Sequence, residues 1–278
     1  MIEGRTGTAP APRRAHDAPR SAAFFDLDKT IIATTSATAF SRPFLAGGLI
    51  TRGDMVRTAY AQFLYLVGGA DAEQTERLRA RLSSVSTGWD VDQVRAIVAE
   101  TIHEHIDPVV YAEAVELIAE HHAAGQEVVV VSASGSEVVE PIAALIGADH
   151  VVASRLAVED GRYTGEIEFY CYGENKAVAI RELAEREGYD LAASFAYSDS
   201  ITDAPMLEAV GHAVVVNPDR ALRRLAVERG WRVARFTHPQ RLSERLRPVV
   251  PAAAVGGAVL ALGAAALVWR AVRRRRRA

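Results

Sequence analysis

Residues 24–32, with the sequence FFDLDKTII, limit the possible folds more than any other stretch of the chain. A short apolar run ends there in two aspartates, Asp26 and Asp28, and Thr30 follows. An apolar run bounded by polar residues is typical of a buried parallel strand, and open α/β sheets bind ligands at the carboxyl ends of such strands. The stretch therefore predicts an α/β fold with acidic side chains at a ligand-binding edge.

The two aspartates also indicate a chemistry. Mg²⁺ in proteins prefers one or two carboxylates together with water and a substrate phosphate. Asp26 can therefore serve as ligand and nucleophile, while Asp28 works as acid and base. Thr30 can hydrogen-bond and fix the turn. A strand end capped by turn-forming Asp and Thr is the structural alternative, and this motif alone leaves both interpretations open.

Composition excludes other classes of protein. A net charge of -3 lacks the excess of positive charge that is typical of nucleic-acid-binding proteins, so no nucleic-acid partner is expected. The single cysteine, Cys171, excludes an internal disulfide framework and favours a reducing, cytosolic setting. A chain of 278 residues can form one α/β domain with an insertion or two domains, and no oligomeric state follows from its sequence.

The first half of the chain divides into three parts. Residues 1–21 are rich in Ala, Pro, Arg and Thr without an apolar stretch, so we expect a disordered arm rather than a signal peptide. Core residues 22–33 follow. From 34 to 124 apolar residues recur at three- and four-residue spacing, which predicts a helical insertion. Its clearest segments are 55–67, 72–82, 91–102 and 109–122.

Residues 127–135 (EVVVVSASG) predict the next strand of the sheet. This strand is expected to be buried, because the β-branched run is too hydrophobic for an exposed strand. The run ends in small and hydroxyl residues before a helix. Ser132 and the free backbone N–H groups of the helix start can hold phosphate oxygens. The same residues would also make an ordinary serine N-cap.

Further polar residues stand at later element ends. Asp160-Gly161 within 156–170 predicts a hairpin. Lys176 lies in the first turn of a helix predicted over 174–187, where the helix dipole disfavours a cation. It could pair with phosphate and a nucleophilic aspartate, and a solvated lysine is the alternative.

The strand predicted over 194–198 delivers Asp199 and Asp203. Asp199 would complete a metal site with Asp26, and Asp203 could orient Lys176 or a metal-bound water. Edge strands are predicted over 213–216 and 231–236.

Taken in order, these residues resemble the four motifs of the haloacid dehalogenase superfamily of phosphotransferases, and the match spans about 22–218. They are Asp26, Asp28, Thr30, Ser132, Lys176, Asp199 and Asp203. The helical stretch 34–124 resembles the C1-type cap of the phosphoserine-phosphatase-like branch, subfamily IB. The resemblance implies a Rossmann-like parallel sheet over 22–33 and 125–238, with an all-helical cap inserted after the first strand.

The resemblance also implies roles. Asp26 would attack phosphorus to form an aspartyl-phosphate, and Asp28 would protonate the leaving alcohol and then activate water. Mg²⁺ would be held by the Asp26 carboxylate, the Asp28 backbone carbonyl and the Asp199 carboxylate, with Asp203 in support. The acid at position 28 favours a phosphatase or phosphomutase over an ATP-driven pump. Residues implied to bind the phosphoryl group or substrate are Thr30, Ser132, Ala133, Lys176 and Thr202.

Two departures from the family pattern bear on the substrate. Phosphoserine phosphatases usually place a glutamate shortly after the first motif to hold the substrate ammonium, and residues 33–40 contain no acid. An unpaired ammonium in a closed site is costly, which argues against phosphoserine. Ala133 and Ser134 stand where two glycines are common, which narrows the room for phosphate. The expected substrate is a small phosphorylated metabolite or a lipid phosphate head group.

The C-terminus suggests attachment to a membrane. After a linker over 239–248, residues 249–269 form 21 uncharged residues, long enough as a helix to cross a hydrocarbon core of about 30 Å. Trp269 ends this segment and the basic tail 270–278 follows, as in membrane-tailed members of the same branch. A buried or peripheral helix with a basic end is the alternative. A tail along the inner leaflet would leave the enzyme domain cytoplasmic.

Two hypotheses of function follow. The first is a Mg²⁺-dependent phosphomonoesterase at the cytoplasmic face of the cell membrane. The second is a membrane-tethered regulatory or interaction protein that has kept the scaffold but lost turnover. The clustered carboxylates favour the first hypothesis, because a retired site has no physical reason to keep them.

Overall fold

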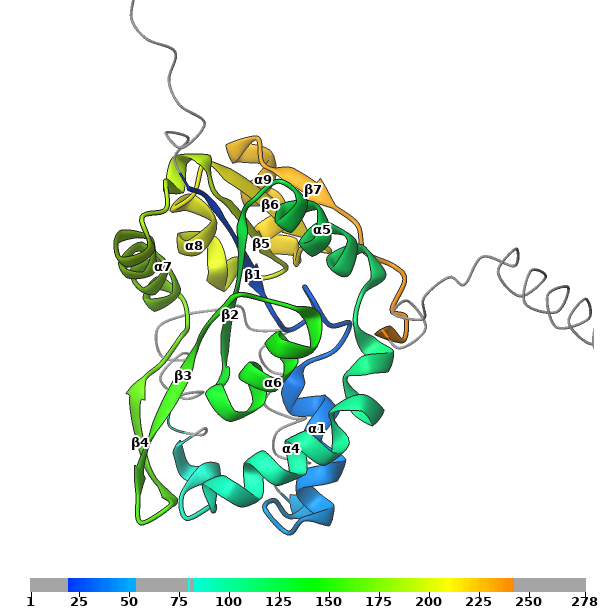
Figure 1. The fold of residues 1–278 in the computed structure, drawn as a ribbon, viewed down its shortest axis with the longest axis vertical. Helices are drawn as coiled ribbons and strands as arrows, with labels where there is room; N and C mark the ends of the chain where they lie inside the picture. Colours follow the sequence, from blue (N-terminus) through cyan, green and yellow to red (C-terminus); the bar gives the residue numbers. More distant parts are fainter. Residues whose placement is uncertain (1–19, 54–79, 81–82, 243–278) are drawn as a thin grey trace, which may run out of the picture. The chain divides into compact units, whose positions relative to one another are not determined.

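The computed structural model describes residues 20–53, 80 and 83–242, and its centre is a seven-stranded sheet in the order β4-β3-β2-β1-β5-β6-β7 (Figure 1). The strands are β1 (Ala22–Asp26), β2 (Glu127–Gly135), β3 (His150–Glu159), β4 (Arg162–Phe169), β5 (Phe195–Ser198), β6 (His212–Val216) and β7 (Arg232–Ala234). All neighbouring strands are parallel except the antiparallel pair β3 and β4. The predicted α/β class with a mostly parallel sheet is confirmed.

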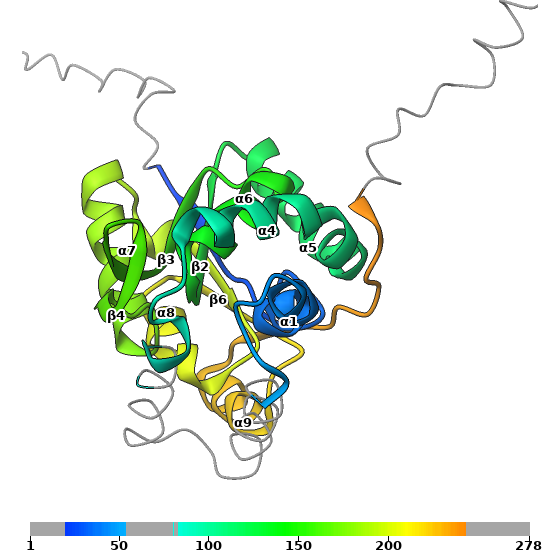
Figure 2. The same ribbon diagram turned by 90° about the horizontal axis from the view of Figure 1, so that it is seen from below.

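Helices cover both faces of this sheet. They are α1 (Ser36–Ala46), α4 (Val91–His105), α5 (Ala112–Ala123), α6 (Ser136–Ile146), α7 (Glu174–Glu187), α8 (Ala204–Glu208) and α9 (Arg220–Arg229), with short 3₁₀ turns η1 (Asp107–Val109), η2 (Leu191–Ala193) and η3 (Ile201–Asp203). Helices α5 and α6 lie on one face, and α7, α8 and α9 lie on the other (Figure 2).

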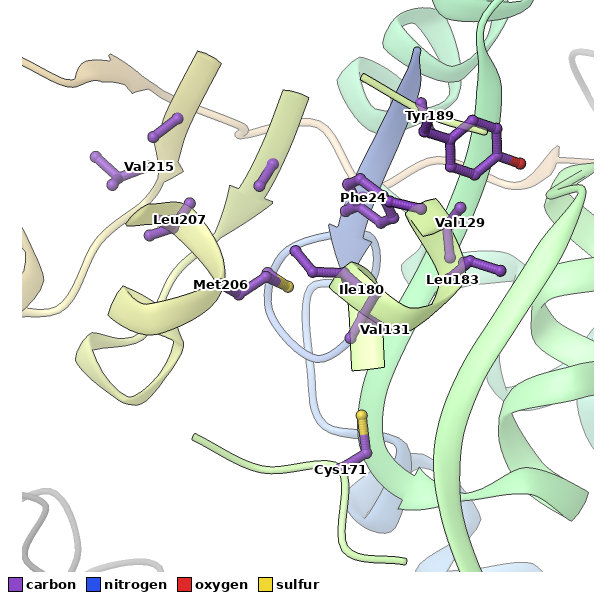
Figure 3. Packing of buried hydrophobic residues seen from close by; sticks show 14 of the residues in the cluster. Phe24, Val129, Val131, Cys171, Ile180, Leu183, Tyr189, Met206, Leu207 and Val215 are labelled. Carbon is purple, nitrogen blue, oxygen red and sulfur yellow. The ribbon is translucent and has the colours of Figure 1, made fainter. Parts of the chain in front are cut away.

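Strand β1 runs through the middle of the core, and all its residues are buried. Successive side chains of a strand point to opposite faces, so the two phenylalanines serve different layers. Phe24 packs with Ile180 and Met206 on the side of α7 and α8 (Figure 3). Phe25 faces the other layer and stacks on Tyr197, with ring centroids 4.2 Å apart. Burial on both faces explains why the run is apolar without alternation.

A buried histidine from α5 joins the layer around Phe25. His121 is 6% exposed, and its Nδ1 lies 2.6 Å from Oε1 of the Gln126 side chain, an amide oxygen that can only accept a hydrogen bond. Neutral His121 therefore donates from Nδ1 and accepts at Nε2 from the Tyr197 hydroxyl, 2.7 Å away. Burial lowers the pKa of His121, which keeps the ring neutral.

The predicted strand over 127–135 and helix over 174–187 are confirmed, as is the hairpin of β3 and β4. Asp160 and Gly161 turn this hairpin with φ of 50° and 76°, the left-handed conformation of a tight β-hairpin turn. The edge position predicted for 213–216 is wrong. Strand β6 lies between β5 and β7, because Arg232–Ala234 adds outside it.

Several predicted segments lie outside the described residues: most of the arm over 1–21, the helices over 55–67 and 72–82, and the segments 249–269 and 270–278. The division into core and cap stays a prediction. Helix α5, at the end of the predicted cap, packs against β1 and β2. Among the residues that are described, no helix combines the length and apolar character needed to cross a membrane.

The lowered pKa of His121 predicts acid-sensitive stability. As pH falls below about 6.5, His121 binds a proton in the unfolded chain but stays neutral in the folded protein. The free energy of unfolding therefore decreases by up to about 1.4 kcal/mol per pH unit. Urea unfolding between pH 7.5 and 5.5 measures this slope. His121→Gln should flatten it. An unchanged slope in His121→Gln would contradict the assignment.

Candidate active site

The polar residues singled out in the sequence gather where β1 and β5 end. Asp26 is the last residue of β1, and Asp199 directly follows β5. The two strands are parallel neighbours, so both aspartates leave the sheet at the same edge. The sequence motifs therefore meet at one site, as expected for the carboxyl edge of an open α/β sheet.

A buried lysine links two of these carboxylates. Lys176 is 2% exposed, and its Nζ donates to Asp26 Oδ1 at 2.6 Å and to Asp203 Oδ2 at 2.8 Å. The Ser198 hydroxyl also donates to Asp203 Oδ2, at 2.7 Å. The interpretation of Lys176 as a solvated side chain is thus wrong. Of the two roles considered for Asp203, the structure shows the contact with Lys176.

Burial and charge act against each other in this cluster. Burial raises the pKa of the Asp26 carboxyl, and the Lys176 ammonium opposes that rise. Burial would also lower the pKa of Lys176, but the Asp203 and Asp26 carboxylates outweigh it and raise that pKa above its ordinary value. Lys176 therefore stays protonated, as a fixed positive charge beside the Asp26 carboxylate.

Asp28 lies in a tight loop after β1. The carbonyl of Leu27 accepts the N–H groups of Ile31 and Ile32 at 2.9 and 3.1 Å, which closes the loop. The Asp28 carboxylate accepts the backbone N–H of Ser36 at 2.8 Å and the Ser36 hydroxyl at 3.3 Å. Burial raises the pKa of Asp28 despite these two hydrogen bonds. The side chain is thus aimed by the first residue of α1 and is biased toward holding a proton.

Asp199 lies in a second loop beside the first. Within the part of the chain that the structure describes, no donor is hydrogen-bonded to its carboxylate. Burial, reinforced by the Asp203 and Asp219 carboxylates, raises the pKa of Asp199 to about 7. Asp219 holds this loop by accepting the N–H of Ile201 at 2.8 Å, while its own N–H donates to the Asp199 carbonyl at 2.9 Å.

The remaining predicted site residues have the following contacts. Ser132 is buried and accepts the N–H of Ser134 at 3.2 Å, and the Ala133 carbonyl accepts the Ser154 hydroxyl at 2.7 Å. The Thr202 hydroxyl lies 3.1 Å from the Ser200 hydroxyl. The N-cap of α6 is Gly135, without a side-chain hydrogen bond, so the serine N-cap alternative is wrong.

Thr30 differs from its expected role. Its hydroxyl is buried and has no hydrogen-bond partner among the described residues. The turn is instead held through the backbone, where the Thr30 N–H donates to the Leu27 carbonyl at 3.4 Å. Thr30 therefore contributes a buried, unused donor and acceptor close to Asp28.

Three residues that support the site were missed in the sequence: Ser36, Asp219 and Asn217. Asn217 has φ of 43°, and its side chain donates to the Phe236 carbonyl at 2.8 Å and accepts the Phe236 N–H at 3.1 Å. The Tyr111 N–H in turn donates to the Ile31 carbonyl at 2.9 Å, in the loop of Asp28. An asparagine between a predicted strand and an N-cap aspartate was the available signal.

The donor set is compatible with Mg²⁺. Among the described side chains, no group of three or more His, Cys, Asp or Glu is arranged to hold a metal. Mg²⁺ needs fewer, because it is bound by one or two carboxylates with water and phosphate. Asp26 and Asp199 supply two carboxylates at one edge, and both pKa values are raised by burial without a nearby divalent charge.

The fold and the site define an α/β protein with an acidic strand end, and comparison with known proteins specifies the family. Residues 23–208 match the family model of haloacid dehalogenase-like hydrolases, and the chain belongs to this family. A Streptomyces azureus protein named "Inhibition of morphological differentiation protein" is 58% identical, over 94% of this chain and 96% of the relative. A probable phosphatase of Mycobacterium tuberculosis is 56% identical, over 93% and 89%.

Solved structures agree with this placement. A phospho-aspartyl intermediate analogue of phosphoserine phosphatase is 22% identical with a TM-score of 0.59, and the match covers 83% of this chain and 99% of the other. This likeness shows the fold. The family model and the phosphatase relatives place the chain among the phosphatases of the phosphoserine-phosphatase-like branch, as the sequence predicted.

The side chain of Asn217 generates a prediction. Asn217→Gly keeps the positive φ but removes the two hydrogen bonds to Phe236, so the free energy of unfolding should fall by about 1–3 kcal/mol. Asp160→Gly, at φ 50° in the hairpin turn, is the matched control for the entropy of glycine. Chemical unfolding and phosphate release are measured for both variants. Equal losses in the two variants would exclude a specific role for Asn217.

Proposed function

We propose that the protein is a Mg²⁺-dependent phosphomonoester hydrolase that acts through an aspartyl-phosphate on Asp26. The observation that carries this proposal is the buried contact of Lys176 with Asp26 and Asp203. It leaves a carboxylate at a strand end beside a fixed positive charge, which suits attack on a negatively charged phosphoryl group. Phosphatase function in a relative that is 56% identical supports the same class of reaction.

The proposed reaction divides the work between two aspartates. The Asp26 carboxylate forms a bond to phosphorus as the bond to the leaving alcohol breaks, and Asp28 donates a proton to that alcohol. Asp28 then takes a proton from water, whose oxygen attacks the phosphorus and releases phosphate, restoring Asp26. The raised pKa of Asp28 supports its role as proton donor, because it increases the protonated fraction.

Binding of the phosphoryl group is assigned to the residues around Lys176. The ammonium of Lys176 and the Ser132 hydroxyl would meet its oxygens, with Ala133, Thr30 and Thr202 assigned to the same site. The buried Thr30 hydroxyl supports this assignment, because it has no hydrogen-bond partner among the described residues and its O–H could donate to a phosphoryl oxygen. Fixed charges and dipoles of this kind stabilise the charge that develops in the transition state.

The metal would be held by the Asp26 and Asp199 carboxylates and the Asp28 backbone carbonyl, with Asp203 in support through Lys176. When bound, Mg²⁺ would neutralise part of the phosphoryl charge and screen the carboxylates from one another. The raised pKa of Asp199, about 7, supports this placement, since a buried acid without a hydrogen-bond donor favours a cation.

Replacing Asp26 tests the mechanism. Asp26→Asn keeps the shape but removes the nucleophile, so phosphate release should fall below about a thousandth of the wild-type rate. Circular dichroism and thermal unfolding should show a folded protein, because Lys176 keeps Asp203 as a partner. Asp92→Asn, at an exposed position of α4, is the control. Hydrolysis that persists in Asp26→Asn would refute this mechanism.

The substrate is proposed to be a small phosphorylated metabolite or a lipid phosphate rather than phosphoserine. The first turn of α1 carries no acidic residue, and Thr35 caps this helix with its own hydroxyl. A substrate ammonium near Ser36 would therefore find no carboxylate from α1, apart from the Asp28 group that the mechanism uses. Within the reach of this helix, the site suits a neutral or anionic leaving group.

A regulatory role is a second candidate, because the relative that is 58% identical is named for inhibition of morphological differentiation. The two candidates are compatible if turnover at Asp26 produces the regulatory effect. In either case we place the enzyme domain in the cytoplasm, with residues 249–269 as its attachment to the inner face of the membrane.

A substrate panel with and without the tail separates these possibilities. Phosphate release with Mg²⁺ should be confined to one class among sugar phosphates, histidinol phosphate, phosphoserine and lysophospholipid phosphates. A chain ending at residue 248 should lose activity on lipid phosphates in vesicles and keep activity on soluble ones. Chelation by EDTA should abolish both activities, and added Mg²⁺ should restore them. Equal release of phosphoserine and the other compounds would contradict the substrate proposal.

A further inference from the structure

Helix α9 has two unlike sides. Leu222 and Ala226 are buried in the core cluster, so this side of α9 packs on the sheet. The opposite side, at helical spacing of three and four residues, is exposed to solvent. It consists of Arg220, Arg223, Arg224 and Val227, with one carboxylate, Glu228, beside them.

Strand β7, which contacts α9, carries further exposed residues of this region. Val233 pairs in register with Val215, and Val215 belongs to the cluster on the α9 side of the sheet. Directly paired side chains of neighbouring strands share a face, so Val233 points to the α9 side, and Arg235, two residues on, lies beyond the strand end. Arg220, Arg223, Arg224, Val227, Val233 and Arg235 are called the arginine face below.

The charge of this region is strongly positive. Residues 220–241 contain seven arginines and one glutamate, while the whole chain has a net charge of -3. Arg229 is paired with Glu208 at 2.7 Å and is not part of the face. Within the described ranges, no carboxylate forms an ion pair with any of the four arginines of the face. Their charge is therefore available to an anionic partner.

Exposed valines distinguish this face from a merely solvated one. Val227 is 78% exposed, the highest value among the large hydrophobic side chains that are described, and Val233 is 48% exposed. Arginines surrounding apolar side chains match a bilayer surface, where the guanidinium groups meet phosphate head groups and the valines meet the acyl boundary. A nucleic acid would pair with the arginines but would leave the exposed valines without an apolar partner.

The position of the face also fits a bilayer. Helix α9 begins after the carboxyl end of β6, and the N–H of its N-cap residue Asp219 donates to the Asp199 carbonyl at 2.9 Å, so Arg220 lies toward the sheet edge that carries Asp26. Beyond Arg241 the chain continues into 249–269, which is uncharged, and into the basic residues 270–278. The chemistry of the chain outside the described residues is thus that of a membrane-attached segment.

We propose that the arginine face docks the folded domain on a bilayer containing anionic phospholipids. This docking is independent of the phosphatase proposal and of how the tail is attached. It brings the edge of the sheet that carries the site close to the lipid surface. The attraction between the arginines and an anionic membrane falls off over about one Debye length, and this length becomes shorter as the salt concentration increases. Docking should therefore weaken as salt increases.

A single polarity-sensitive label on the full chain tests the proposal. The only cysteine, Cys171, is buried, so a thiol probe on Val227→Cys marks the face selectively. Its emission should shift to the blue with phosphatidylcholine vesicles containing phosphatidylglycerol, and not with phosphatidylcholine alone. Val178→Cys, at a 42% exposed site on α7, is the control and should not shift. A protein that sediments with the vesicles while the Val227 probe stays in water would overturn the proposal.

Removing charge gives a second, independent measurement. Arg220→Gln, Arg223→Gln and Arg224→Gln combined should raise the vesicle dissociation constant at least about tenfold at low salt or abolish the shift of the Val227 probe. Replacing Arg162, Arg181 and Arg186 by Gln changes the net charge equally at exposed positions elsewhere and should have no such effect. Equal effects of the two triple variants would mean that only overall charge matters. Asp26→Asn should keep the probe shift, so failure of docking and failure of catalysis are distinguishable.

Discussion

The buried contact of Lys176 with Asp26 and Asp203 is the interaction on which the rest of the site depends. It joins residues from β1, α7 and the turn after β5, which are far apart in the sequence. Burying any one of these charges alone would be costly, and losing one partner of a buried pair costs about 3–5 kcal/mol. The three elements must therefore come together with their charges paired. This buried cluster of charges lies at the site where we propose that a phosphoryl group binds.

Much of this arrangement could be predicted because it is local. Strand β1, strand β2 and helix α7 are each specified by a run of apolar residues or by helical periodicity, and their ends carry Asp26, Ser132 and Lys176. The parallel sheet then brings strand ends to one edge without further information. The prediction of the acidic edge therefore needed only short stretches of sequence.

The parts that were missed depend on pairs of distant residues. Asn217 holds Phe236, and Asp219 holds the loop of Asp199, but neither has a periodicity or motif that reveals its partner. The order of β6 and β7 is likewise set by packing at the sheet edge. Lys176 shows the same limit, because a lysine in a first helical turn looks solvated until two carboxylates from other elements surround it.

The hydrogen bonds between Asp28 and Ser36 have a consequence for timing. Ser36 is the first residue of α1, the helix that follows the loop of Asp28, and both its N–H and its hydroxyl donate to the Asp28 carboxylate. A rigid shift of α1 would therefore carry the carboxylate with it, or break two hydrogen bonds and change its affinity for a proton. If Asp28 delivers the proton to the leaving group as proposed, this delivery depends on the position of α1, and a substrate that moves α1 would also control when its own bond can break.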